Sequence, residues 1–317
     1  MDILILLGYL VTILSGLKLV ELCMRRMFLP YSKSRCVLLT GCDTGIGNSL
    51  AQELDKRGVR VFASCLTDEG VTKLSEKCSS NAVVFRLDVT RDDEIQNAVN
   101  LVKSKLSDDE VLWGLVNNAG VLLLAAPLEW QTKEIYDKTL AVNLYGTIGM
   151  TKAFLPLLRK SKGRIVNMSS IVSMLAIGKL APYNISKAAI ESFTDTLRRE
   201  MYHMGVTAHL IQPSGFATNI FPADAGDRLR KAFDQLPKEV QEFYGEKSAE
   251  LGLTDMVNAP VTVEKDLTKA TRVIQHALFA RYPRYRYPVG PGAVSVCWTL
   301  SHFPEIVPDR LLAMAAP

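Results

Sequence analysis

The sequence has little charge of one sign and few of the groupings that bind metals. Its 37 basic and 33 acidic residues give a net charge of +4 without a long run of either sign, so no nucleic-acid-binding surface is indicated. Its six cysteines lie far apart, form no C-x-x-C pair and have no neighbouring histidine to complete a zinc site. We therefore expect reduced, mostly buried thiols, no metal and no nucleic-acid partner.

Two further absences narrow the chemistry. The sequence contains no G-x-S-x-G elbow, and none of its four histidines stands in a motif with a nucleophile, which argues against a hydrolase. No internal repeat or low-complexity segment is visible. A hydrophobic content of 48% in 317 residues fits a folded chain with one large core or two smaller ones.

The amino-terminal segment is dominated by aliphatic residues. From Ile3 to Val20 the only charge is Lys18, and the length just reaches that of a membrane-spanning helix. Asp2 precedes this stretch, and basic residues follow it at Arg25, Arg26, Lys33 and Arg35. This asymmetry predicts that residues 1–29 are an uncleaved membrane anchor with the following domain on the cytoplasmic side. A buried first helix, or one lying in the membrane interface, is the alternative.

A glycine-rich turn follows the first predicted strand. Residues 36–40 are an apolar run of strand type, and residues 48–57 carry a helical pattern. Between them, glycines at 41, 45 and 47 allow a tight turn and a close approach of backbone N–H groups to a pyrophosphate. Such a cluster can be an ordinary turn, but strand, glycine turn and helix in this order are typical of a dinucleotide-binding βαβ unit. We predict an α/β fold with a doubly wound parallel sheet.

Two later strand ends carry candidate contacts to a dinucleotide. The predicted strand 59–64 ends at residues 65–68, where such folds discriminate the ribose. No Arg or Lys is present there to bind a 2′-phosphate, which favours NAD over NADP, and Asp68 is close enough to be the ribose ligand. Asp88, at the end of the predicted strand 83–89, can accept from an adenine amino group.

A fourth predicted strand, residues 113–116, leads into Asn-Asn-Ala-Gly at residues 117–120. The amides of such a turn can be purely structural and tie adjacent strands together. Beside a cofactor crevice, the same residues also line the adenosine and ribose side. Both roles remain open from the sequence.

Tyr183 and Lys187 lie four residues apart in an apolar-periodic run that reads as a helix, so both side chains share one face. A phenol titrates near pH 10 and is a poor base at neutral pH. A neighbouring ammonium favours the phenolate, so we expect Lys187 to lower the pKa of Tyr183 and make it a general acid and base. The alternative is a surface tyrosine beside a solvated lysine.

Together these motifs resemble the short-chain dehydrogenase/reductase family. The resemblance covers about Arg35 to Tyr287, and it depends on several motifs that occur in order and at the family's spacing. They are Thr40-Gly41-x-x-x-Gly45-Ile46-Gly47, Asn117-Asn118-Ala119-Gly120, Asn143, Ser170, Tyr183 and Lys187. The sequences of residues 38–45, 63–67 and 197–200 are similar to those of membrane-associated retinol and hydroxysteroid dehydrogenases. Mitochondrial 3-hydroxybutyrate dehydrogenases are the nearest rival.

The resemblance implies roles for individual residues. Ser170, at the end of the predicted strand 163–168, should hydrogen-bond the substrate oxygen, and Asn143 should hold a water in a proton relay to Lys187. Asn143 can instead be a buried amide that bridges two backbone groups. Ser214 stands where the family has glycine after Pro213, so the nicotinamide loop can differ here. The implied cofactor contacts are Thr40, Gly41, Asp43, Gly45, Ile46, Gly47, Leu66, Asp88, Asn117, Ala119, Gly120, Tyr183, Lys187, Pro213 and Thr218.

The carboxyl third departs from strand–helix alternation. Residues 224–233 and 236–251 carry helical periodicity with an apolar stripe that is either core or a substrate lid over about residues 220–261. The stripe consists of Phe233, Leu236, Val240, Phe243 and Tyr244. Beyond residue 291 the tail 292–317 is apolar, but its segments 293–300 and 306–316 are too short to span a bilayer, which leaves a second membrane contact or a dimer surface.

The sequence as a whole, with the resemblance, predicts one dehydrogenase domain over residues 30–291. It would transfer a hydride between NAD(H) and a lipophilic alcohol, a retinol or a hydroxysteroid, at the endoplasmic reticulum membrane with the domain facing the cytosol. A homodimer is possible. One alternative is a 3-hydroxybutyrate dehydrogenase-like enzyme that uses Lys179, Arg228 or Arg230 to hold a carboxylate. Another is a catalytically silent, membrane-tethered scaffold.

Overall fold

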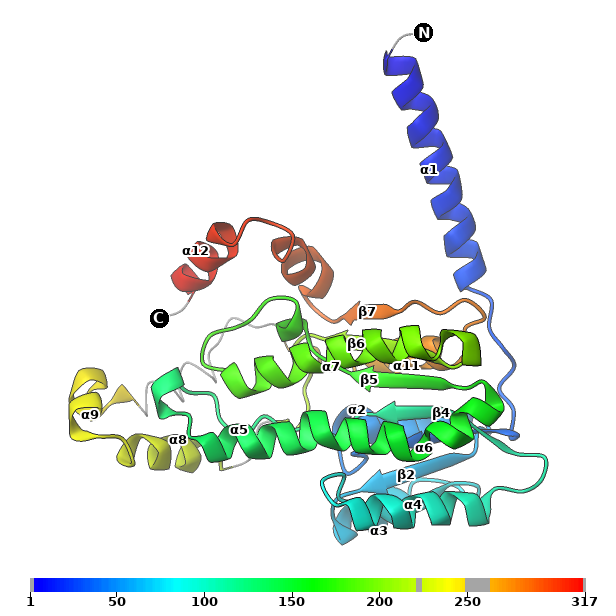
Figure 1. The fold of residues 1–317 in the computed structure, drawn as a ribbon, viewed down its shortest axis with the longest axis horizontal. Coiled ribbons are helices and arrows are strands. Elements are labelled where there is room, and N and C mark those ends of the chain that lie inside the picture. Colours follow the sequence, from blue (N-terminus) through cyan, green and yellow to red (C-terminus); the bar gives the residue numbers. More distant parts are fainter. Residues whose placement is uncertain (1–2, 221–223, 249–262, 316–317) are drawn as a thin grey trace.

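Seven parallel strands form one sheet in the order β3-β2-β1-β4-β5-β6-β7, with helices on both faces (Figure 1). The computed structural model describes residues 3–220, 224–248 and 263–315. The chain order reverses between β1 and β4, so the predicted doubly wound sheet is confirmed. The strands are β1 (Arg35–Leu39), β2 (Val61–Cys65), β3 (Val83–Arg86), β4 (Val111–Asn117), β5 (Arg164–Met168), β6 (Thr207–Pro213) and β7 (Arg286–Val289).

The central strands are largely buried and mainly apolar because helices cover both faces of the sheet. In β1, Val37 and Leu39 face one core cluster, Cys36 and Leu38 face the other, and all four are fully buried. The first cluster is covered by α2 (Gly45–Lys56), α3 (Asp68–Ser75) and α11 (Thr268–Phe279). The second is covered by α4 (Asp92–Lys105), α6 (Thr147–Ser161) and α7 (Ala181–Glu200).

The remaining helices lie around this core. A short helix before α5, the π-helix that joins α5 to α6 and the turn after β5 position loops near the carboxyl ends of the strands, whereas the turn after α7 leads into the amino end of β6. These elements are η1 (Leu128–Trp130), α5 (Lys133–Leu140), η2 (Ala141–Gly146), η3 (Ile171–Ser173) and η4 (Tyr202–Met204). The carboxyl third adds α8 (Ala225–Asp234), α9 (Lys238–Tyr244), the π-helix η5 (Ala293–Trp298) and α12 (Ile306–Ala315).

Some predicted boundaries are wrong. The helical pattern expected to continue to residue 251 ends at Tyr244, because Gly245 adopts a positive φ of 80° that stops the helix. Residues 249–261 of the expected lid lie outside the described part of the chain. The strand expected over residues 83–89 stops at Arg86. All six cysteines are free, and Cys36, Cys42 and Cys65 are buried.

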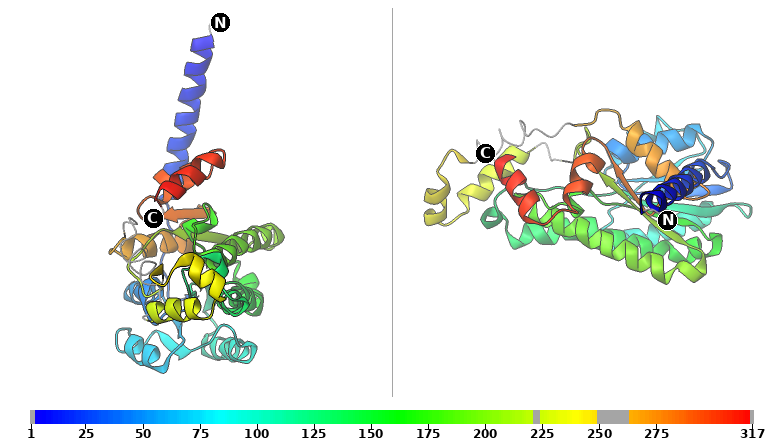
Figure 2. Two further views of the ribbon diagram at one scale, coloured as in Figure 1. Left: turned by 90° about the vertical axis from the view of Figure 1, so that its left-hand side faces the viewer. Right: turned by 90° about the horizontal axis from the view of Figure 1, so that it is seen from above.

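The first helix, α1 (Ile3–Arg25), stands away from the domain (Figures 1 and 2). Its segment Leu7–Arg25 spans 19 residues with a mean hydropathy of 1.6 and none of it is buried, so by length and composition it could cross a membrane. Backbone hydrogen bonds join the chain after α1 to the end of α11, since Leu29 N donates to Phe279 O at 2.7 Å and Arg281 N donates to Met27 O at 2.7 Å. The base of α1 is therefore fixed to the domain.

The apolar stripe of the expected lid mostly packs as a small core. Phe233 of α8 is buried and its ring lies 5.2 Å from that of Trp130, which also meets Tyr244 of α9 at 5.3 Å. Leu236 joins the same cluster, whereas Phe243 is 81% exposed. Helices α8 and α9 thus extend the domain from η1 at the carboxyl edge of the sheet.

Candidate active site

Tyr183 and Lys187 occupy the first two turns of α7 and are both buried, with 8% and 4% of their surfaces exposed. Pro182 stands at the start of this helix, where its missing N–H is not needed. The ammonium Nζ of Lys187 lies 5.5 Å from the ring centroid of Tyr183 and donates to the Met168 carbonyl at 2.8 Å. The alternative of a surface tyrosine beside a solvated lysine is therefore wrong.

Burial controls the ionisation of this pair in the chain on its own. Desolvation raises the pKa of Tyr183 to about 12, although a hydrogen bond with Ser170 lowers it in part. Desolvation also lowers the pKa of Lys187 to about 8. The expected lowering of the Tyr183 pKa is thus not found here, because the cost of burying a phenolate outweighs the effect of its neighbours. Burial thus disfavours both charged forms of the pair, the phenolate of Tyr183 and the ammonium of Lys187.

Ser170 follows β5 and caps η3. Its Oγ donates to the Pro213 carbonyl and accepts from the Val172 N–H, both at 3.4 Å. These long bonds hold the hydroxyl weakly, so it can turn toward a substrate oxygen at little cost. Ser169, by contrast, donates to the Lys187 carbonyl at 3.1 Å and fastens β5 to α7.

Asn143 lies within the π-helix η2 and is almost fully buried. Its side-chain amide donates to the Val121 carbonyl and to Ser186 Oγ, both at 3.0 Å, and accepts from Val121 N at 2.8 Å. This is the backbone bridge that the sequence left open as the structural role. A Cβ on Gly120 would lie 3.4 Å from Asn143 Oδ1 and 3.5 Å from Lys187 Nζ, so the three residues converge. Ser186 is a member of this group that sequence reasoning missed.

The glycine turn after β1 fits tightly against the end of β4. Gly41 has a φ of 68°, and a Cβ there would lie 2.7 Å from Ala119 Cα. A Cβ on Gly47 would lie 2.5 Å from the Gly41 carbonyl. Thr44 precedes α2 without a side-chain cap, so the first N–H groups of that helix lack a capping acceptor. The turn and the helix N-terminus together fit the pyrophosphate of a dinucleotide.

The Asn-Asn-Ala-Gly turn holds this loop in place. The Asn118 amide donates to the carbonyls of Thr40 and Gly41, both at 2.9 Å, and Thr40 Oγ1 accepts from the N–H groups of Asn118 and Ala119, both at 3.0 Å. The buried Asn117 amide instead donates to Asn167 Oδ1 at 2.8 Å, on the next strand. The side chains of both asparagines are thus used to tie strands together.

The turn after β2 is organised by Asp43. Its carboxylate accepts from Leu66 N at 2.8 Å, Thr67 N at 3.0 Å and Thr67 Oγ1 at 2.8 Å. Leu66 is 52% exposed at the tip. A Cβ on Gly70 would lie 2.4 Å from Asp43 Oδ1, so only glycine fits there without displacing this carboxylate, and nothing in the sequence indicated the pairing. Asp43 places a negative charge at the expected ribose site.

Asp88, which follows β3, uses one of its two carboxylate oxygens for hydrogen bonds within the chain. Asp88 Oδ1 accepts from Thr90 N at 2.9 Å and from Thr90 Oγ1 at 2.8 Å, which forms a local turn before α4. Both bonds use the same oxygen. A hydrogen bond from an adenine amino group to Asp88 stays a prediction, and the second carboxylate oxygen, Oδ2, would accept it.

The loop after β6 contains Ser214, which packs against Gly290, the residue that follows β7. Ser214 N donates to the Val289 carbonyl at 2.9 Å, and its Oγ is buried without a partner among the described residues. A Cβ on Gly290, whose φ is 99°, would lie 2.3 Å from that Oγ. At the crevice, a Cβ on Gly45 would lie 3.1 Å from Thr218 Cγ2, so this loop reaches the glycine turn. Sequence reasoning missed Gly290.

Apolar side chains surround the catalytic edge. Tyr183 belongs to a buried cluster with Leu122, Ile171, Val172 and Ala293. The cluster also contains Ala293 and the partly buried Cys297 from η5, so the carboxyl tail packs against the same apolar cluster as Tyr183. The sequence offered no signal for this contact, because the apolar tail reads equally well as a membrane or dimer surface.

Comparisons with known proteins match this architecture. The family described as short chain dehydrogenase matches residues 35–228. Retinol dehydrogenase 7 of Rattus norvegicus is 37% identical over 305 residues, 96% of each chain. The 17-beta-hydroxysteroid dehydrogenase type 6 of Mus musculus is 36% identical over 309 residues, 97% of this chain and 96% of the other. A short chain dehydrogenase from Burkholderia cenocepacia J2315 in complex with NADP superposes with a TM-score of 0.66 at 22% identity, covering 88% of this chain and 98% of that one.

The chain belongs to the short-chain dehydrogenase family. Its similarity to retinol and hydroxysteroid dehydrogenases over nearly the whole length confirms the subgroup that the motifs indicate. It is therefore an oxidoreductase of the short-chain dehydrogenase type.

Proposed function

We propose that this protein is a membrane-attached, NAD-dependent dehydrogenase of a retinol or a hydroxysteroid. The observation that carries the proposal is the buried Tyr183, Lys187 and Ser170 group at the carboxyl edge of the sheet, set in an apolar cluster. The domain would comprise residues 30–291, with the anchor before it and the apolar tail after it.

The roles follow from the positions of the side chains. Tyr183 exchanges a proton with the alcohol, Ser170 orients the reacting oxygen, and Lys187 supports the phenolate through its charge. Asn143 fixes Val121 and Ser186 beside Lys187 and would hold the relay water. A bound nicotinamide supplies the hydride acceptor, and the protein supplies position and electrostatics.

Two features support NAD over NADP. The Asp43 carboxylate lies under the turn at Leu66 and Thr67, where a 2′-phosphate would add a second negative charge. The residue at the tip is the apolar Leu66 rather than Arg or Lys. The remaining cofactor contacts are those of the glycine turn, Asp88, the turn at residues 117–120, Pro213 and Thr218.

A lipophilic substrate is favoured over a hydroxy acid. A hydroxy acid needs a cation for its carboxylate, and two of the three candidates are held in ion pairs within α8, because Arg228 pairs with Asp224 at 2.9 Å and Arg230 pairs with Asp234 at 3.2 Å. The side chains next to Tyr183 are instead aliphatic, and they stabilise a ligand by roughly 25 cal/mol for each Å² of apolar surface that is buried.

We place the protein at the endoplasmic reticulum membrane with the domain in the cytosol, and two exposed apolar surfaces support the attachment to a membrane. Helix α1 and the carboxyl-terminal helices project from the same side of the domain (Figures 1 and 2). On η5, Val294, Val296 and Trp298 are 47–54% exposed, whereas Ala293 on the same helix packs beside Tyr183. Such a helix would let an alcohol pass from the bilayer to the site, and we favour this role over a dimer surface.

The test is a substrate panel with the full chain in detergent micelles. We expect kcat/KM for a retinol or a hydroxysteroid with NAD to exceed that for 3-hydroxybutyrate by at least 100-fold. Efficient turnover of 3-hydroxybutyrate, lost in Lys179→Ala, would overturn the substrate assignment. No turnover of any alcohol, with intact NAD binding, would favour the scaffold.

A further inference from the structure

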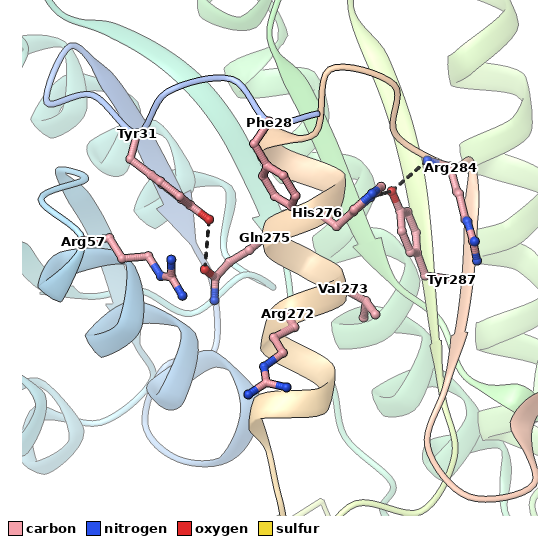
Figure 3. A pocket seen from close by; sticks show the side chains of 9 residues that line it. All are labelled: Phe28, Tyr31, Arg57, Arg272, Val273, Gln275, His276, Arg284 and Tyr287. Atoms are coloured by element: carbon pink, nitrogen blue, oxygen red, sulfur yellow. Dashed lines mark hydrogen bonds between the residues drawn. The ribbon is translucent and has the colours of Figure 1, made fainter. Parts of the chain in front are cut away.

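A hollow in the surface lies at the opposite end of the domain from Tyr183. It measures about 610 Å³ and crosses the outer surface of α11 beside the base of α1 (Figure 3). Aromatic and aliphatic side chains form part of its wall, and three arginines stand around it. The lining residues are Phe28, Tyr31, Arg57, Arg272, Val273, Gln275, His276, Arg284 and Tyr287.

The wall of this hollow is held by its own hydrogen bonds. His276 lies 2.7 Å from the Tyr287 hydroxyl through Nδ1 and 2.8 Å from the Arg25 carbonyl at the end of α1 through Nε2. Tyr31 donates to Gln275, which donates in turn to Glu53 at 2.7 Å. Hydrogen bonds of His276 thus join the end of α1, helix α11 and strand β7 at the wall of the hollow.

The guanidinium groups of the three arginines around the hollow are available to interact with a ligand. Arg57 and Arg272 point to one side of α11 and Arg284 lies on the other (Figure 3). Across residues 3–220, 224–248 and 263–315, none of these three arginines is within ion-pair distance of a carboxylate. The nearby Glu53 carboxylate accepts from Thr271 and Gln275 instead.

The position of the hollow defines what can reach it. Phe28, 48% exposed, lies at the side of the hollow toward α1, and the isolated antiparallel bridge between Phe28 and Ala280 holds it there. If α1 crosses a bilayer, its base lies at the level of the lipid headgroups. A lipid beside α1 could then keep its acyl chains against the apolar helix while its headgroup entered the hollow.

We propose that this hollow binds the phosphate-bearing headgroup of an anionic phospholipid. Guanidinium groups present planar pairs of donors that match phosphate oxygens, and they are less strongly hydrated than ammonium groups. Arg57 and Arg272 bind the phosphate from one side, and Arg284 contributes charge from the other. The site orients the domain against the membrane surface. This assignment depends on the proposed attachment through α1, but not on the proposed substrate.

Thermal unfolding of the full-length protein in nonionic detergent micelles tests the site. Micelles are doped with increasing mole fractions of phosphatidic acid or of phosphatidylcholine. We expect phosphatidic acid to raise Tm of the native protein and phosphatidylcholine to leave it unchanged. In Arg57→Gln/Arg272→Gln/Arg284→Gln, the fraction of phosphatidic acid needed for the half-maximal shift should rise at least tenfold.

A matched variant separates a site from diffuse charge. Lys77→Gln/Lys103→Gln/Lys105→Gln removes the same charge from exposed residues after α3 and on α4, and should leave the response within twofold. Helix α3 packs on β2 and β3 and α4 lies on the opposite face of the sheet from α11, whereas α11 packs on β5, β6 and β7. If the triple arginine variant is unstable without lipid, Arg57→Gln alone should still weaken the response about threefold. An equal loss in the lysine variant would overturn the proposal.

Further titrations distinguish a phospholipid from a soluble phosphate or an acidic protein as the bound anion. Inorganic phosphate or glycerol 3-phosphate that gives the full shift at millimolar concentration would show a soluble phosphate ligand and overturn the lipid assignment. A polyglutamate peptide that gives the same shift would show an acidic protein partner instead. Because micelles replace the bilayer and no turnover is measured, these outcomes are independent of the substrate panel.

Discussion

The cofactor half and the substrate half of this domain are built on different principles. From β1 to β4, the expected dinucleotide crevice is formed by backbone held at close range, with Gly41 and Gly47 in places where a Cβ would meet backbone at 2.7 and 2.5 Å. From β5 to η5, the site is formed by side-chain functional groups with altered pKa values and weak hydrogen bonds. Function in the first half therefore depends on the shape of the backbone. Function in the second half depends on the ionisation and orientation of side chains.

This difference predicts different signatures for mutations. A change in the cofactor half should act on folding and dinucleotide affinity together, because the same backbone contacts serve both. A change in the substrate half should act on kcat and its pH dependence while leaving the dinucleotide affinity in place. The variants below test that division, from the largest expected effect to the smallest.

Tyr183→Phe should produce the largest effect. The ring and its apolar contacts are kept, and only the hydroxyl that exchanges the proton is removed, so kcat should fall by about 10² to 10⁴-fold. The dissociation constant for NAD should stay within about threefold. Steady-state rates and NAD titration by fluorescence measure the two quantities. Activity above a few per cent of the native value would refute the role of Tyr183.

Lys187→Ala should show that the pair, rather than the tyrosine alone, sets the pH dependence. In the native chain the pair loses its first proton near pH 8, since burial lowers the Lys187 pKa to about 8. The kcat/KM for alcohol oxidation should therefore rise with pH up to about 8 and then level off. In Lys187→Ala the group that titrates near pH 8 is absent and burial still raises the pKa of the Tyr183 phenol, so the rise should move to higher pH.

The rate at neutral pH gives the size of this effect. We expect kcat/KM at pH 7 to fall by about 100-fold in Lys187→Ala. Lys187→Arg is the control, because it keeps a positive charge but cannot lose its proton in this range. A pH profile that is identical in native protein and Lys187→Ala would show that another group titrates.

Gly41→Ala tests the shape-based half. The substitution combines a positive φ with a contact of 2.7 Å to backbone, so it should destabilise the fold by about 2 kcal/mol or more and weaken NAD binding over tenfold. Gly58→Ala is the matched control, since Gly58 has a φ of 77° with nothing within 4 Å of its Cβ. That variant should show the strain alone, about 1 kcal/mol, with unchanged NAD affinity.

The sequence could predict most of the cofactor half because its signals are local. A strand, three glycines and a helix stand next to one another in the chain, and the spacing of Tyr183 and Lys187 places them on one helix. It could not predict contacts that depend on distant residues, such as Ser214 against Gly290 or η5 beside Tyr183. It also could not predict the direction of the Tyr183 pKa, which depends on how completely the fold buries the phenol.

Leu66→Arg should have the smallest effect and tests how shape and charge combine at the edge of the cofactor half. Leu66 is half exposed, so a guanidinium there can reach a 2′-phosphate without disturbing the core, while the Asp43 carboxylate stays on the backbone of the same turn. We expect the ratio of kcat/KM for NADP to that for NAD to rise about tenfold, which corresponds to about 1.4 kcal/mol. Leu66→Gln is the control, because it adds polarity without charge and should change the ratio less than threefold. A native preference of tenfold or more for NADP would contradict the assignment and would mean that a cation elsewhere in the chain overcomes the charge of Asp43.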